Sequence, residues 1–392
     1  MKLVRAYQQT DFTKVPVDIM TFIQDPEYLG NTGLSNIYPY WVKALIDLYP
    51  TCLDTIFNEV LISGACGTGR TTLSIVGFLY DLYRVTLLTD PQGKWALDTG
   101  TPIVLSVIDT DTQHSHIKKM LLDVFDTSPY FQSLLGSKPC KDLTCDMFPH
   151  NVGVEVHTNE NGLIGKAVIG SIIDTYNITS DTVGLIMDMY LTTYRRRFSR
   201  FISSQNAAPT HMWIVSSAGS PLEKLINSRP LTSDVIVYRP SIWDVQSFKG
   251  VYCGEYFYVS VGSIIKEPAI LSDVPNNLGN VIKVPVEYRK EFERSIYNAL
   301  QDLAGIVPPY KERDDIVEFN VSCTMKKRWA NQFIAFLECL ESYGRNGCSR
   351  VVAFYADGDG DFRPRFSTDL VGIDPAEPKK TKDGGYDLFD AG

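Results

Sequence analysis

A glycine-rich segment between an apolar run and a helical pattern constrains the fold more than any other feature. The segment Gly64–Thr71 (GACGTGRT) follows EVLIS and continues into TLSIVGFLYDLYRV. It matches the phosphate-loop pattern G-x-x-x-x-G-K-[ST] at every defined position except one, where Arg70 replaces the lysine. Gly64, Gly67 and Gly69 allow the backbone to curl with its N–H groups pointing inward, and the helix N-terminus adds partial positive charge. The alternative is a glycine-rich turn that binds nothing.

The motif predicts which residues bind a nucleotide. The predicted phosphate-binding residues are Gly64, Gly67, Thr68, Gly69, Arg70, Thr71 and Thr72. Thr71 is expected to place its hydroxyl on the Mg²⁺ that accompanies ATP. A guanidinium is broad and bidentate where a lysine ammonium is compact, so Arg70 bears on phosphate transfer more than on binding.

Five apolar, β-branched runs alternate with helical patterns between residues 59 and 240. They are 59–64, 102–109, 166–174, 212–219 and 234–238. Apolar runs without polar alternation indicate a parallel sheet that is covered on both faces. We therefore predict an α/β P-loop NTPase fold, with a mainly parallel central sheet flanked by helices.

Composition and pattern divide the chain into three parts. Residues 1–50 are expected to be helical and irregular, and residues 51–310 to form the P-loop ATPase domain. Residues 311–392 are expected to be a linker and tail, because the last forty residues are rich in Asp, Gly, Pro and Lys and carry little helix or strand signal. The region after residue 240 is predicted to be antiparallel or irregular, because VYCGEYFYVSVG alternates.

Composition excludes several classes of protein. The net charge of −9 rules out a polybasic chain that binds nucleic acid through bulk charge, so DNA would need a local basic patch. No apolar run approaches the ~18 residues of a membrane span, and the start of the chain lacks a signal-peptide core. The eight cysteines contain no CxxC pair, which argues for reduced thiols in a cytoplasm.

An aspartate at the end of an apolar strand is the second requirement of a phosphate-loop enzyme, because it helps to hold Mg²⁺. Asp174 follows AVIGSII and Asp188 follows LIM. We favour Asp174, because Asp188 lies in a helical pattern and is expected to be a solvated carboxylate. Thr175 stands where a glutamate would orient the attacking water. The predicted catalytic positions are thus Arg70, Asp174 and Thr175, with Thr71 and Asp174 as the metal ligands.

The densest basic patch lies in the helical pattern MDMYLTTYRRRFSRF. It consists of Arg195, Arg196, Arg197 and Arg200. These arginines either contact DNA or a neighbouring subunit's nucleotide, or they form a solvated helix face. No metal is predicted beyond nucleotide-bound magnesium, because the five histidines lack H-x-x-x-H spacing and Asp357–Asp361 lacks the glycine and glutamate of an EF-hand.

With these segments in view, residues 15–310 resemble the ATPase half of the large terminase subunit of tailed bacteriophages. GACGTGRTT is similar to its Walker A loop, and IGSIIDTYNI to a Walker B strand. LTTYRRRFSRF resembles a basic helix of the family, and IVSSAG its coupling segment, with Ser216, Ser217 and Ala218.

The resemblance implies an ATP-driven motor that moves double-stranded DNA into the phage capsid. It implies ATP and Mg²⁺ as cofactors and a ring of copies at the portal protein. A small terminase subunit and a separate nuclease chain are further implied partners, in the host bacterial cytoplasm and transiently at the procapsid portal. About 82 residues follow position 310 (392 − 310), too few for the family's RNase H-like nuclease, although FSTDLVGID resembles its first strand, with Asp369 as a ligand.

Two departures from the family pattern leave alternatives open. Arg70 and Thr175 together are also compatible with a nucleotide-binding clamp or regulatory subunit of the same machinery, which leaves hydrolysis to a partner. A helicase is a third alternative, but no helicase-type arginine motif follows IVSSAG. DNA stimulation of ATP hydrolysis separates the motor from the clamp.

Overall fold

The computed structural model of the chain forms two compact units. The described residues are 9–53, 55–109, 115–136, 140–144, 146–174, 183–202, 208–220, 223, 232–263, 266–272, 279–309, 350–356 and 362–367. The first unit lies within residues 1–261 and 268–311, and the second within 262–267 and 312–392. The domain boundaries at 51 and 311 stay predictions.

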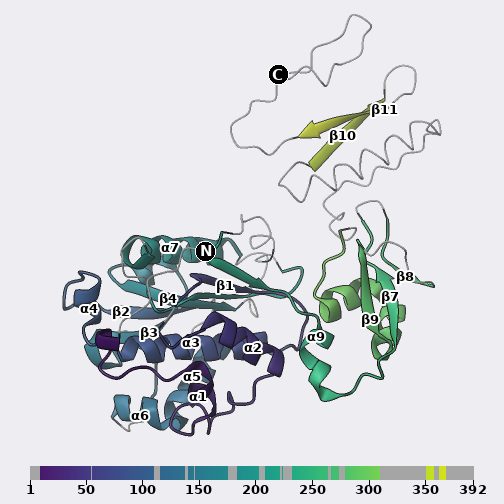
Figure 1. The fold of residues 1–392 in the computed structure, drawn as a ribbon. Helices are drawn as coiled ribbons and strands as arrows, with labels where there is room; N and C mark the ends of the chain where they lie inside the picture. Colours follow the sequence, from purple (N-terminus) through teal and green to yellow (C-terminus); the bar gives the residue numbers. More distant parts are fainter. Residues whose placement is uncertain are drawn as a thin grey trace, which may run out of the picture. The chain divides into compact units, whose positions relative to one another are not determined.

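A six-stranded parallel sheet forms the centre of the first unit (Figure 1). Its order is β3-β2-β4-β5-β1-β6, and all neighbours run parallel. The strands are β1 (Glu59–Ile62), β2 (Ile103–Ile108), β3 (Val152–His157), β4 (Ala167–Asp174), β5 (Met212–Val215) and β6 (Val235–Tyr238). The predicted α/β fold with a parallel sheet is confirmed, and each of the five apolar runs contains a strand. Strand β3 was not predicted, because the glycine and glutamate of VGVEVH interrupt its apolar run. An edge strand tolerates such residues.

Helices and helical turns precede, connect and follow these strands. They are η1 (Gln9–Asp11), α1 (Ile19–Gln24), α2 (Pro39–Leu48), α3 (Arg70–Thr86), α4 (Pro91–Lys94), α5 (His116–Thr127), α6 (Pro129–Leu135), η2 (Pro149–Asn151), η3 (Glu160–Leu163), α7 (Val183–Arg197), η5 (Phe198–Ile202), α9 (Ile242–Gln246) and η6 (Ser247–Lys249). Polar residues cap several of them. The Asp18 carboxylate, for example, accepts from the N–H groups of Met20 and Thr21 at the start of α1.

Helices cover both faces of the sheet (Figure 1), so its strands are apolar on both sides. On one face, α7 packs Ile186, Met189 and Tyr190 against alternate strand residues; these are Leu61, Ile108, Ile173, Met212 and Ile214. On the other face, the intervening strand residues join a larger core with α1, α2, α3 and α5. The N-terminal helices therefore share the core of the sheet.

Helix α3 lies unusually close to β5. A Cβ at Gly77 of α3 would lie 2.0 Å from the indole of Trp213 in β5. Both residues are buried, and Trp213 has no exposed surface. Glycine is therefore required in the middle of this helix, despite its low helix propensity, because no side chain fits between the two elements.

A three-stranded antiparallel sheet follows in the same unit, with the order β8-β7-β9. Its elements and the helical turns after it are β7 (Tyr256–Ser260), β8 (Ala269–Leu271), β9 (Val281–Pro285), η7 (Val286–Tyr288), α10 (Arg289–Arg294), α11 (Ile296–Ala299) and η8 (Leu300–Ala304), the last a π-helical turn. Phe257, Val259 and Val284 of the sheet pack with Phe292, Leu300 and Ala304 in a separate core. The antiparallel character predicted from alternation is confirmed.

The described part of the second unit contains an antiparallel pair, β10 (Arg350–Ala356) and β11 (Phe362–Ser367). The tail therefore contains strand structure that the sequence pattern signals only weakly. FRPRFS contains a proline, which argues against a strand interior. In a two-stranded sheet both strands are edges, where proline is tolerated, and Pro364 lies opposite Phe354. Asp357–Asp361 and Asp369 lie outside the described residues.

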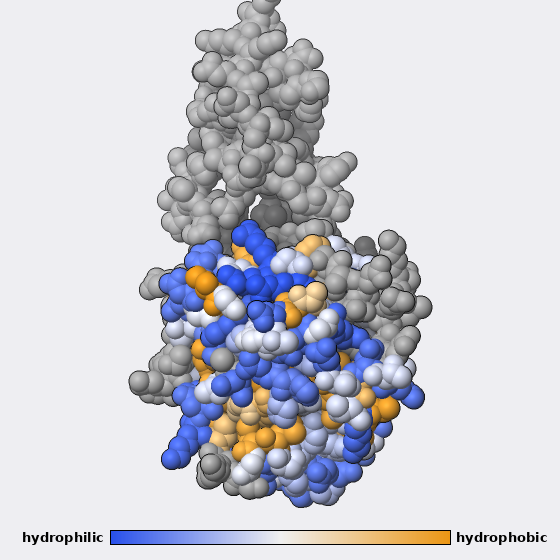
Figure 2. Space-filling model, turned by 90° about the vertical axis from the view of Figure 1, so that its left-hand side faces the viewer, coloured by the Kyte–Doolittle hydropathy of each residue, from blue (hydrophilic) through white to orange (hydrophobic). Residues whose placement is uncertain are grey.

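The surface seen from the left-hand side of Figure 1 is mostly hydrophilic, with hydrophobic residues gathered in the lower part of the face (Figure 2). In the part of the chain that the structure describes, no helix is both long and apolar enough to cross a membrane.

Candidate nucleotide-binding site

The glycine-rich segment forms the loop between β1 and α3, and the helix begins at Arg70. Gly64, Gly67 and Gly69 have φ values of 115°, 68° and 76°, in a region that L side chains rarely adopt. Gly69 is the N-cap and provides no side-chain acceptor. The N–H groups of the first turn of α3 are therefore suited to an external anion.

Thr71 and Asp174 meet beside this loop. The Thr71 hydroxyl, on the first turn of α3, donates to Oδ2 of Asp174 at 2.7 Å, although the residues are 103 positions apart. Asp174 ends β4, which is separated from β1 by β5 alone. A hydroxyl and a carboxylate are the hard oxygen donors that Mg²⁺ prefers, so the pair fits the predicted metal site. Asp188 is exposed on α7, as expected of a solvated carboxylate.

Arg70 joins the loop to the segment that follows β5. Its Nη1 donates to the carbonyl oxygens of Gly64, at 2.7 Å, and of Ser216, and its Nη2 donates to Oγ of Ser217 at 3.1 Å. Burial lowers the pKa of Arg70, while Cys66 and the carboxylates of Asp174 and Glu223 act to raise it. The side chain remains cationic at neutral pH. It therefore places a positive charge between Gly64 of the loop and the segment Ser216–Ser217.

The predicted coupling segment, Ser216–Ala218, lies directly against the loop. The Ser216 N–H donates to the Ile62 carbonyl at 2.8 Å, and the Ala218 N–H donates to the Gly64 carbonyl at 3.4 Å. Beyond it, the buried Glu223 accepts from the Ser63 hydroxyl at 2.8 Å and from the Gly219 N–H. Sequence reasoning did not single out Glu223, because it lies in no recognisable motif.

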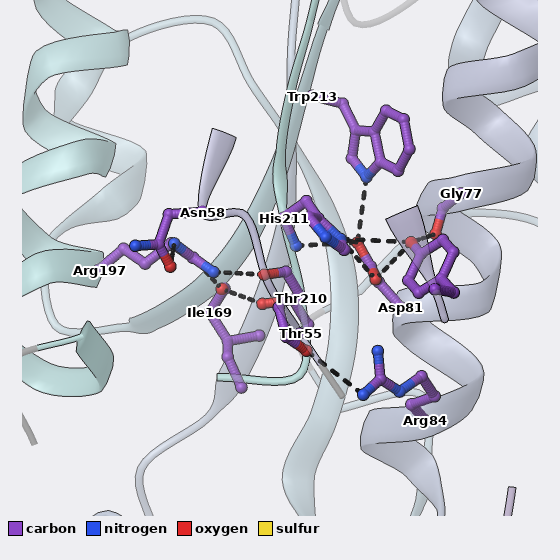
Figure 3. A network of polar contacts seen from close by, with 11 residues as sticks. Thr55, Asn58, Gly77, Asp81, Arg84, Ile169, Arg197, Thr210, His211 and Trp213 are labelled. Carbon is purple, nitrogen blue, oxygen red and sulfur yellow. Dashed lines mark hydrogen bonds and ion pairs between the residues drawn. The ribbon is translucent and has the colours of Figure 1, made fainter. Parts of the chain in front are cut away.

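A buried polar network joins α3 to the start of β5, at the end of the strand away from the glycine-rich loop (Figure 3). The Asp81 carboxylate accepts from the hydroxyl of Tyr49 at 2.7 Å, the N–H of His211 at 2.9 Å and the indole N–H of Trp213 at 3.0 Å. Burial, with Asp81 beside it, raises the pKa of Tyr49, so the phenol stays a donor. Together with the Arg70 contacts, this network ties α3 to β5 at both ends.

Three further segments support the loop from outside. The Trp41 indole of α2 donates to the Thr68 carbonyl at 2.5 Å, and the Ala65 N–H donates to the Pro240 carbonyl at 3.1 Å. The Cys66 N–H donates to the carbonyl of Asp302 in η8 at 2.8 Å.

The two other predicted phosphate-binding threonines lie within the loop and the helix after it. The Thr68 hydroxyl donates to the Ala65 carbonyl at 3.0 Å, so its side chain stabilises the loop itself. Thr72 follows in the first turn of α3, half-buried.

The arginine cluster divides into two kinds of residue, which corrects the prediction for Arg197. Arg197 is fully buried and donates to the carbonyls of Ile169, at 2.7 Å, and Thr210, so it holds β4 to the strand beside it and cannot contact DNA. Arg200 donates to the Lys166 carbonyl at 2.8 Å. Arg195 is exposed and Arg196 half-buried, and both remain candidates for an outside partner.

A second carboxylate lies at the same edge of the sheet as Asp174. Asp109 directly follows β2, whose last residue, Ile108, pairs with Ile173 of β4. Neighbouring strands are about 4.8 Å apart, so Asp109 and Asp174 leave the sheet side by side. The run PIVLSVID carries the same signal as AVIGSIID, an apolar strand that ends in aspartate, and this signal could have identified Asp109. Thr175 lies outside the described residues.

Comparison with known proteins finds a distant structural likeness to this chain. No protein-family model matches the chain, and no curated protein matches it. Among solved structures, the large terminase of bacteriophage HK97 is similar, with a TM-score of 0.37 and 13% sequence identity. The match covers 57% of this chain and 43% of the terminase, less than half of that protein's length. A likeness at this level carries no information about activity.

Proposed function

We propose that the chain binds Mg²⁺·ATP at the loop Gly64–Thr71 and hydrolyses it. The observation that carries the proposal is the 2.7 Å contact between the Thr71 hydroxyl and the Asp174 carboxylate. It lies next to a loop whose three glycines have positive φ and whose helix begins without a side-chain cap. A hydroxyl, a carboxylate and the backbone N–H groups at the start of a helix are the parts that a magnesium-bound triphosphate requires.

Each residue has a distinct part in this proposal. The loop N–H groups from Gly67 to Thr72 would hold phosphate oxygens, and Arg70 would neutralise phosphate charge. Thr71 and Asp174 would hold Mg²⁺, which neutralises charge that develops on the transferred phosphoryl group. Asp109 would orient the attacking water, since it leaves the sheet beside Asp174.

Replacing Asp109 with asparagine is expected to lower the kcat of ATP hydrolysis about 100-fold or more, with little change in ATP affinity. The substitution keeps the size of the side chain but removes the carboxylate that would accept a proton from water, and general-base assistance is worth roughly 10²–10⁴-fold. Steady-state turnover combined with calorimetric ATP binding separates the two effects. Unchanged kcat would exclude Asp109 from this role.

We further propose that hydrolysis drives double-stranded DNA into a phage capsid, as the large-terminase resemblance of the sequence implies. The support is the order of segments along the chain and the direct contact of Arg70 with Ser216 and Ser217. Through this contact, phosphate binding at Arg70 would move the coupling segment. Arg195 and Arg196 would then contact DNA or a neighbouring copy, in a ring at the portal protein.

ATP turnover with and without double-stranded DNA tests this proposal. A motor is expected to hydrolyse ATP faster when DNA is present, and Arg195→Ala combined with Arg196→Ala should reduce that stimulation while basal turnover persists. Turnover that DNA does not change would contradict the motor.

A nucleotide clamp is the second candidate, and one observation favours it. Arg70 already donates to the carbonyls of Gly64 and Ser216. Its guanidinium therefore has a structural role in the loop, in addition to any contact with phosphate. A clamp would bind ATP without turnover, and exchange of Arg70 for lysine together with Thr175→Glu would restore hydrolysis.

A further inference from the structure

An aromatic cluster lies next to the last glycine of the loop, outside the residues assigned so far. A Cβ built on Gly69 would lie 3.4 Å from the ring of Tyr38, so this ring lies against the loop where α3 begins. The Phe248 ring lies 5.6 Å from Tyr38 between centroids, at an interplanar angle of 46°. Lys249 places its ammonium 5.3 Å from the centroid of the Tyr38 ring.

The backbone fixes these side chains relative to the loop from both sides. Tyr38 is the N-cap of α2, the helix whose Trp41 indole donates to the Thr68 carbonyl. Phe248 and Lys249 belong to η6, which follows α9, and the chain enters α9 from Pro240, whose carbonyl accepts from the Ala65 N–H. A capping box between Ser241 and Asp244 holds the start of α9. The cluster is therefore positioned by the same contacts that position the loop.

The exposure of Phe248 has no explanation in the packing of the core. Its side chain is 51% exposed, whereas most large aromatic side chains of the unit are buried. Ordering an apolar ring at the surface gives up the favourable burial that such a ring normally provides. A flat, exposed ring beside a phosphate-binding loop offers a stacking surface for a second flat ring.

We propose that Phe248, supported by Tyr38 and Lys249, is the stacking platform for the base of the nucleoside triphosphate whose phosphates the loop binds. This inference rests on the proposed nucleotide binding and names the part of the ligand that a phosphate loop alone does not recognise. Ribose and α-phosphate separate a base from the β-phosphate, so the base lies beside the loop and not within it. The Tyr38 ring next to Gly69 provides an aromatic surface at this position. Lys249 holds the Tyr38 ring by a cation–π contact and adds positive charge near the phosphates.

The test compares ATP with inorganic tripolyphosphate, which carries the phosphates without the base. Both are titrated calorimetrically, with Mg²⁺, into the full-length chain. Stacking of a base on an aromatic side chain is lost on truncation to alanine, so Phe248→Ala is expected to weaken ATP binding roughly 10- to 100-fold. Tripolyphosphate affinity should stay unchanged, which also shows that the loop of the variant is intact. Phe248→Trp should retain ATP affinity.

The matched control is Tyr256→Ala. Tyr256 of β7 is 44% exposed and has the Lys283 ammonium 3.8 Å from its ring centroid, so it is a second exposed aromatic–lysine pair, in the antiparallel sheet. This variant should bind both ligands as the wild type does. If Phe248→Ala bound ATP as tightly as the wild type, the stacking platform would be refuted, while the proposed nucleotide binding would stand. A wild type that binds neither ligand would overturn the proposed function, and the platform with it.

Discussion

Replacing Asp174 with asparagine should reduce ATP turnover by at least about 100-fold. The asparagine amide keeps the size of the side chain and an oxygen for the Thr71 hydroxyl, which now lies 2.7 Å from Oδ2, but it removes the negative charge that would hold Mg²⁺. A bound metal stabilises phosphoryl transfer by several kcal/mol, and each 1.36 kcal/mol is a factor of ten in rate. Phosphate release measured under saturating ATP gives the turnover.

The control for this experiment is Asp188→Asn. Asp188 was the second sequence candidate for the metal ligand, and it lies exposed on α7. Its substitution should leave turnover within about twofold and stability within about 0.5 kcal/mol. If Asp188→Asn abolished turnover and Asp174→Asn did not, the assignment of the metal site would be wrong.

Replacing Asp81 with alanine should destabilise the protein by about 3–5 kcal/mol. Asp81 has no exposed surface, and its carboxylate accepts from Tyr49, His211 and Trp213 (Figure 3). Alanine would leave these three donors buried without their acceptor and would open a cavity between α3 and β5. This loss is a large part of the roughly 5–15 kcal/mol by which a typical domain is stable.

Urea denaturation followed by tryptophan fluorescence measures the effect, because Trp213 is part of the network. Asp81→Asn keeps one carbonyl acceptor and should cost less than alanine. Asp123→Ala, an exposed aspartate on α5, should change stability by no more than about 0.5 kcal/mol. A free energy of unfolding for Asp81→Ala equal to that of Asp123→Ala would show that the network contributes nothing.

Local pattern was sufficient to predict the glycine-rich loop and every strand of the parallel sheet except β3. Buried parallel strands read as continuous apolar runs, and the three glycines of the loop have few other uses at that spacing. The pairing of Thr71 with Asp174 followed from the same logic, because the loop and the acidic strand end lie at one edge of a parallel sheet. The edge strand β3 was missed because its glycine and glutamate interrupt the apolar run.

The long-range contacts could not be predicted from pattern. Three adjacent arginines read as a surface patch, yet Arg197 is buried because the carbonyls of Ile169 and Thr210 lie where α7 ends. Asp81 is visible as a charge in an apolar helix, but its partner His211 is 130 positions away. Tyr38 and Phe248 likewise meet only because α2 and the α9–η6 segment both attach to the loop.

Calorimetric titration of Mg²⁺·ATP into the full-length chain and into Thr71→Val tests the central claim most directly. Valine matches the shape of threonine but removes the hydroxyl that contacts Asp174. We predict one nucleotide bound per chain, with an affinity that falls about tenfold or more when Mg²⁺ is chelated and in Thr71→Val. Absence of binding, or binding that neither chelation nor the substitution weakens, would contradict a magnesium–nucleotide site at this loop.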